Sequence, residues 1–134
     1  MIEKVQGKFL RYLFYKETGT YLLHIPKTDV MNRHNIMNLE HRRNVASVLF
    51  LYKLLNNQIS DHNLLGLISL NVPSYRTRNP LMFYVDTYRT NYYSNSPIIV
   101  MCRLNNQIAN NCDIFKANNV LFRKTVIPLL RPGM

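Results

Sequence analysis

The sequence predicts a mainly α fold of about four to five helices, with a short β-like or irregular segment around residues 72–95. Three segments, residues 2–16, 39–56 and 97–110, repeat their apolar residues at the spacing of an amphipathic helix. Only residues 81–85 have the composition of a short strand. A length of 134 residues with 47% hydrophobic residues suits one globular domain, so we expect a single helical module over residues 1–134.

The first helix is expected from Ile2 to Lys16. Its apolar residues recur at intervals of three and four: Ile2, Val5, Phe9 and Leu13. On the opposite side, about 100° of rotation per residue aligns three cations, termed the basic stripe, and a tyrosine that continues it: Lys4, Lys8, Arg11 and Tyr15. Gly19 is expected just beyond the helix end.

Residues 18–38 have irregular apolar spacing and contain Pro26, which predicts a connector with one short helix or one extended piece. Asn38 is a suitable N-cap for a second long helix that runs from Leu39 to about Asn56. Its residues 45–55 are almost continuously apolar, so this helix is expected to be the central core helix.

Three further elements are predicted in the second half of the chain. A short helix is expected from about Asp61 to Leu70, capped by Ser60 or Asp61, and residues 72–80 are read as a loop. Ser96 followed by Pro97 favours a helix start, and that helix should reach about residue 110. A last helical stretch over residues 120–130 should end or kink at Pro128.

The charge balance indicates a polyanionic partner, with nucleic acid the first candidate. The chain has 17 Lys and Arg against 7 Asp and Glu, for a formal net charge of +10 at pH 7. Its two cysteines favour a reduced intracellular protein, with nuclear and cytoplasmic locations both open. The N-terminus is charged where a signal peptide is apolar, and we expect no membrane span.

The sequence does not predict an enzyme. The acidic residues are scattered singly, whereas polymerisation by two metal ions needs carboxylates that converge. The histidines lack metal-ligand spacing, and the glycines are too dispersed for a phosphate-binding loop. We therefore expect no catalytic residue, no metal, no cofactor and no small-molecule substrate.

Basic and aromatic residues supply the candidate binding sites. The basic stripe suits successive phosphates, although it also fits a solvated helix face. A second patch mixes guanidinium groups with phenol rings that suit unpaired bases, unless the rings belong to the core: Tyr75, Arg76, Arg78, Arg89 and Tyr92. Arg42 and Arg43 in the first turn of a helix oppose its dipole, which suggests an outside partner, either a phosphate or a carboxylate such as Glu40 or Asp86.

Three blocks together resemble one family: residues 2–11 (IEKVQGKFLR), residues 39–43 (LEHRR) with 50–57 (FLYKLLNN), and residues 76–78 (RTR) through 95–97 (NSP). The chain resembles the C-terminal region, beyond the reverse transcriptase palm, of polyproteins of LINE-type (non-long-terminal-repeat) retrotransposons such as those of insects. Family members tend to have a basic residue two or three positions after Asn-Ser-Pro, whereas here the first is Arg103. The resemblance implies a fragment of an RNA-directed DNA polymerase without its catalytic core.

Three functions remain open from the sequence. The first is a non-catalytic helical module that binds RNA or DNA in a sequence-tolerant manner. The second is a protein-interaction or structural remnant whose apolar helices packed on the missing polymerase core, which would then be its partner. The third is a relic with no selected function. A nucleic-acid binder should gather its charges on one face, and a remnant should expose an apolar patch.

Overall fold

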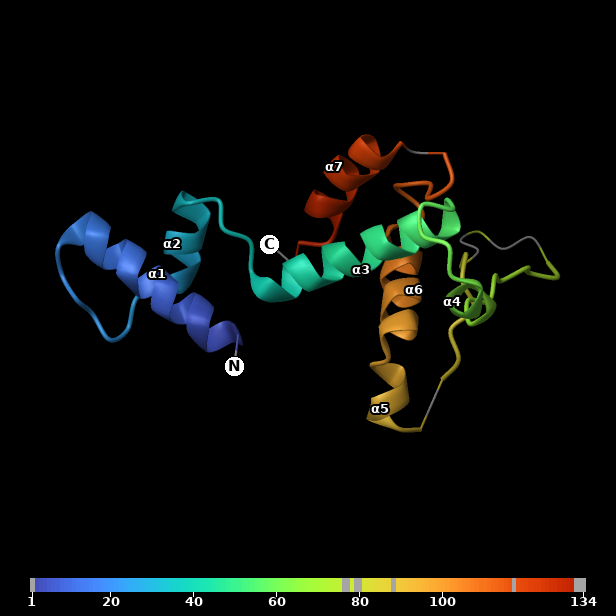
Figure 1. The fold of residues 1–134 in the computed structure, drawn as a ribbon, viewed down its shortest axis with the longest axis horizontal. Helices are drawn as coiled ribbons and strands as arrows, with labels where there is room; N and C mark the ends of the chain where they lie inside the picture. The colour runs from blue at the N-terminus through green and yellow to red at the C-terminus, as the bar shows by residue number, and fades with distance from the viewer. Residues whose placement is uncertain (1, 76–77, 79–80, 88, 117, 132–134) are drawn as a thin grey trace. The chain divides into compact units, whose positions relative to one another are not determined.

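The fold is mainly helical, as the sequence predicts. The computed structural model describes residues 2–75, 78, 81–87, 89–116 and 118–131, which form seven helices and no β-strand (Figure 1). The chain divides into two compact units, residues 1–42 and 43–134, and each is described separately. The single module therefore stays a prediction.

Unit 1 pairs a long helix, α1 (Ile2–Thr18), with a short one, α2 (Lys27–Arg33). Leu10 and Val30 are buried, and Gly7 in α1 is buried as well. The Lys27 Nζ atom lies 4.0 Å from the point where a Cβ on Gly7 would stand, so the Lys27 side chain of α2 reaches this glycine. For the connector of residues 18–38, the sequence predicted either one short helix or one extended piece, and the structure has the short helix α2.

The face of α1 that packs differs from the one that the apolar spacing indicates. Ile2, Val5 and Phe9 are 61%, 64% and 51% exposed, whereas Leu10 is 2% exposed. Gly7 and Leu10 are three residues apart on one side of α1, and this side is the one that is buried. Of the predicted apolar spacing only Leu13 is half-buried. The basic stripe has two exposed lysines, Lys4 and Lys8, and a half-buried Arg11.

The ends of the two helices in unit 1 are joined by polar contacts. The Glu17 carboxylate lies 3.1 Å from Arg33 Nη1 and 3.0 Å from His34 Nε2. At the other end of α1, the Gln6 side-chain amide donates a hydrogen bond to the Met37 carbonyl oxygen. Exposed ion pairs stabilise a fold by only about 0–1 kcal/mol each, so these contacts mainly orient the helices.

Helix α3 (Leu39–Leu55) contributes more residues to the buried core of unit 2 than any other helix, which confirms the predicted core helix. It begins at the predicted cap, because Asn38 Oδ1 accepts a hydrogen bond from the Glu40 N–H. The Tyr52 ring stacks on Phe122, with ring centroids 4.5 Å apart. The side chains of unit 2 with no exposed surface come from the beginning, the middle and the end of its sequence: Val48, Leu51, Leu54, Phe83, Ile114, Phe122 and Val126.

Helix α4 (His62–Gly66) is shorter than predicted and ends at Gly66 rather than Leu70. Asp61 is its cap and accepts hydrogen bonds from the Asn63 and Leu64 N–H groups. A last turn follows through Leu67 and Ile68, and Leu70 then forms an isolated antiparallel bridge with Phe83. The β-like residues 81–85 therefore form one bridge and not a strand.

Three helices complete unit 2: α5 (Asn91–Ser94), which the sequence did not predict, α6 (Pro97–Ile108) and α7 (Asn119–Leu129). Helix α6 starts with Pro97 at its first position, as expected, and α7 ends one residue after Pro128. Asn106 of α6 holds the bridge in place, because its side chain exchanges two 2.9 Å hydrogen bonds with the Phe83 backbone.

Candidate nucleic-acid interface

The basic stripe is a line of cations that have no acidic partner in the part of the chain that the structure describes. Lys4 and Lys8 are exposed and Arg11 is half-buried, all on α1. Glu17, the acid at the other end of this helix, is already paired with Arg33 and His34. The stripe therefore presents positive charge that is not neutralised within the described residues.

Beside the stripe lies an open groove of about 280 Å³, termed the tyrosine groove, which combines two cations with three phenol rings: Lys8, Arg11, Tyr12, Tyr15 and Tyr21. Four of these residues belong to α1, and Tyr21 comes from the segment that follows it. All three rings are about half-exposed or more, at 59% for Tyr12, 49% for Tyr15 and 68% for Tyr21.

The turn after α1 brings Tyr21 to the groove. Gly19 has a φ of +70°, a left-handed conformation that favours glycine, and its N–H donates a 2.8 Å hydrogen bond to the Tyr15 carbonyl oxygen. The Thr18 hydroxyl group is within hydrogen-bond distance of the Phe14 carbonyl oxygen and of Thr20 Oγ1. These contacts close the last turn of α1 and reverse the chain toward the helix.

The described members of the second predicted patch lie on two separate segments of unit 2. Tyr75 and Arg78 lie in the loop after Leu70, whereas Arg89 and Tyr92 lie at the start of α5; all four are exposed, and Arg76 lies outside the described residues. The coloured part of this loop follows α4, and it lies away from α5 (Figure 1). Tyr92 packs edge-on against Tyr93 of the same helix, with centroids 6.3 Å apart.

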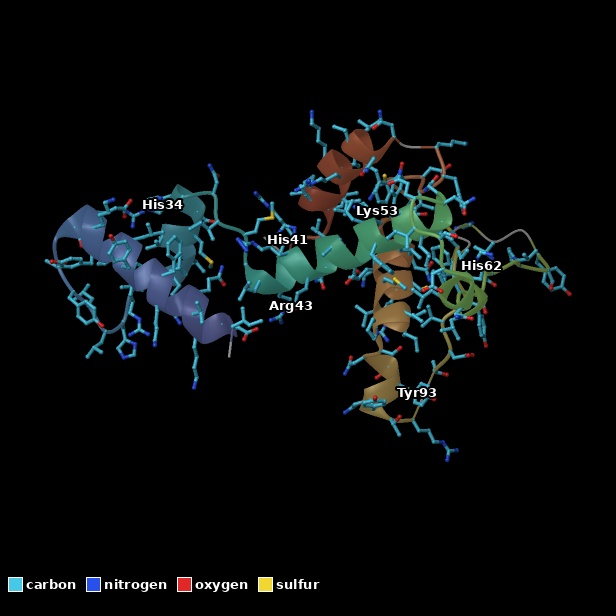
Figure 2. The ribbon with its side chains drawn as sticks, in the orientation of Figure 1. His34, His41, Arg43, Lys53, His62 and Tyr93 are labelled. Atoms are coloured by element: carbon cyan, nitrogen blue, oxygen red, sulfur yellow. The ribbon has the colours of Figure 1, made fainter. Side chains whose placement is uncertain are left out.

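Arg42 and Arg43 are both exposed at the beginning of α3, where the sequence places them. Figure 2 shows Arg43 at this end of the helix and Lys53 near the other end. The boundary between the two units falls between the two arginines. The Arg43 carbonyl oxygen accepts a hydrogen bond from the Ser47 hydroxyl group.

The cysteines and histidines form no site in the described residues. Cys102 and Cys112 are buried as free thiols, and burial raises the pKa of Cys102 to about 11 and also raises that of Cys112. Such thiols are poor nucleophiles at neutral pH. Among the residues that the structure describes, no three His, Cys, Asp or Glu side chains are close enough to hold a metal ion.

Sequence reasoning found part of the tyrosine groove. It placed Lys8, Arg11 and Tyr15 on one side of the first helix but did not include Tyr12 or Tyr21. Tyr12 is one residue from Arg11 and three from Tyr15, so a wider helical face would have included it. Tyr21 had no such signal, because its position depends on the turn at Gly19.

The sequence matches no protein-family model, no curated protein and no solved structure. Within the described ranges, no helix is long and apolar enough to cross a membrane.

Proposed function

We propose that this chain is a non-catalytic module that binds RNA or DNA, with little dependence on base sequence, through the basic stripe of α1. The observation that carries the proposal is the row of Lys4, Lys8 and Arg11, which have no acidic partner among the described residues. Lysine and arginine bind phosphates and release condensed counterions whatever the base sequence. The resemblance to the post-palm region of LINE-type reverse transcriptases supports the same function, for a fragment that grips template and primer without chemistry.

Two further groups of residues are proposed to contact the nucleic acid, each as a separate contact. Arg42 and Arg43 would contact phosphates at the start of α3, and Tyr75, Arg76, Arg78, Arg89 and Tyr92 would contact the nucleic acid from unit 2. The exposure of the described members supports this proposal. Their separation between a loop and α5 indicates independent contacts and not a single pocket.

The test compares the stripe with a control of the same composition. One variant carries Lys4→Ala, Lys8→Ala and Arg11→Ala. The control carries Lys53→Ala, Lys124→Ala and Arg131→Ala, which removes two lysines and one arginine that are exposed in unit 2. Both variants lose three charges, so the diffuse positive field changes equally.

Affinity for a fluorescent duplex and for oligo(dT) is measured over a series of salt concentrations. In the stripe variant the slope of log affinity against log salt should fall by about 2.7 on the duplex and about 2 on oligo(dT), because each lost contact contributes roughly 0.9 or 0.7. The control should lose much less. Equal losses in the two variants would show that the stripe is only part of a diffuse field.

The exposed apolar stripe of α1 favours a second candidate, a surface that packs on a polymerase core. Ile2, Val5 and Phe9 are more than half exposed, which is unusual for three neighbouring apolar side chains on one helix. A recombinant LINE-type fingers-and-palm fragment serves as the probe in a sedimentation titration. Binding that is lost in Phe9→Ser but retained in the stripe variant would support this candidate, and no binding would exclude it for that core.

A further inference from the structure

The three phenol rings of the tyrosine groove do not stabilise the fold in any way that the described residues show. The side chains of Tyr12, Tyr15 and Tyr21 form no hydrogen bond and no ring contact with another described residue. Tyr52, in contrast, is buried and stacked on Phe122. Aromatic rings that are exposed, adjacent and unused by the core are typical of a surface that binds a flat apolar ligand.

The two cations in the groove select the class of that ligand. Lys8 and Arg11 have no acidic partner in the described part of the chain, so an anionic group of the ligand would form ion pairs with them. A ligand with both flat rings and regularly spaced negative charges is a polynucleotide whose bases are accessible. A duplex offers the charges but hides the faces of its bases, so only an unpaired strand uses both halves of the groove.

The dimensions agree with a short single-stranded stretch. Lys4 and Arg11 are seven residues apart on α1, a rise of about 10 Å, which matches two or three phosphates of one strand. The groove volume of about 280 Å³ is at the lower limit of ordinary ligand sites, which are roughly 300–1,000 Å³. This volume suits one or two bases.

We propose that the tyrosine groove binds an unpaired segment of RNA or DNA, with its backbone along the basic stripe and its bases stacked on Tyr12, Tyr15 and Tyr21. The chain consequently binds single strands more tightly than duplexes of the same length and charge. This inference rests on the proposed function, since it assigns the basic stripe to phosphates. Stacking tolerates any base, so the preference is for the unpaired state and not for a sequence.

The test uses the full chain with three probes: oligo(dT), oligo(U) and a duplex, at one salt concentration. Tyr12→Ala and Tyr21→Ala should each weaken binding to the two single strands by roughly 5- to 100-fold, the usual effect of losing one stacked base, and change duplex binding by less than about twofold. Tyr12→Phe and Tyr21→Phe should bind as the original chain does, because stacking uses the ring and not the hydroxyl group.

A matched control is available in unit 2. Tyr84 is 59% exposed, the same fraction as Tyr12, and its side chain forms no hydrogen bond with the described residues. Tyr84→Ala should therefore leave all three affinities unchanged. The chain has no tryptophan, so tyrosine emission is a second readout. Oligo(dT) should quench it, and less so in Tyr12→Ala. Far-UV circular dichroism verifies that each variant is folded.

The outcomes separate this inference from the proposed function. In one outcome, the double variant Lys8→Gln, Arg11→Gln binds all probes more weakly, but the tyrosine variants lose no more affinity for single strands than for the duplex. The stripe then binds phosphates, and the groove is not a base-stacking site. If the charge variant has no effect, the proposed function itself is wrong. Tyrosine-dependent binding to vesicles of anionic lipid, with no effect on oligonucleotides, would overturn the inference in favour of a membrane surface.

Discussion

Substitution by alanine should change the free energy of unfolding in opposite directions at two glycines, Gly7 inside α1 and Gly19 just after its end. Gly19 has a φ of +70°, and a Cβ added there would meet no atom within 4 Å, so Gly19→Ala is penalised only by the backbone. The left-handed conformation costs an L-residue about 1–2 kcal/mol. Gly7 is inside the helix, and a Cβ there would meet only Lys27 Nζ at 4.0 Å, an ordinary contact. Gly7→Ala should therefore stabilise the chain by about 0.5–1 kcal/mol.

The assay is urea unfolding of the full chain followed by far-UV circular dichroism. Gly7→Ala should raise the free energy of unfolding and Gly19→Ala should lower it. Asn35 and Asn57 already have positive φ angles of 52° and 57° in this chain, so Gly19→Asn should cost less than Gly19→Ala. A change of the same sign for Gly7→Ala and Gly19→Ala would refute the assigned backbone conformation of one glycine.

Two further predictions concern unit 2. Burial favours the neutral thiol of Cys102 and raises its pKa from the ordinary 9.0 to about 11. The thiol therefore contributes its full stability below pH 9, and the free energy of unfolding should fall by about 2 kcal/mol as the pH rises toward 11. Urea unfolding over this pH range should show a smaller loss in Cys102→Ala; identical losses would contradict the burial of the thiol. Phe122→Ala should cost about 3–5 kcal/mol, because the ring is fully buried against Tyr52. Phe115→Ala, at an exposed position, is its control, and similar losses in both would contradict the described core.

Local signals predicted the long helices because each has its own start or stop. Asn38 caps α3 and Pro97 occupies the first position of α6. Gly19 ends α1 in a left-handed conformation. Such signals act through backbone hydrogen bonds and dihedral angles within a few residues, so they can be read without the rest of the fold.

The elements that were mispredicted depend on distant parts of the chain. Helix α4 is short because residues after Gly66 pair with Phe83, and the apolar spacing in this segment contains no information about that bridge. Gly7 and Leu10 became the buried face of α1 because α2 packs there. The basic stripe was predicted because helical periodicity alone aligns it, whereas Tyr21 reaches the groove through a turn.

The most direct measurement of the central claim is the protection of lysines in the unaltered chain. The chain is acetylated with and without saturating oligo(dT), and the modification of each lysine is quantified by mass spectrometry. Lys4 and Lys8 are exposed on the basic stripe, and Lys53 and Lys124 are exposed in unit 2. Binding through α1 predicts that oligo(dT) slows acetylation of Lys4 and Lys8 severalfold more than that of Lys53 and Lys124. Equal protection of all four lysines, or protection of Lys53 and Lys124 alone, would contradict the claim that the stripe is the binding surface.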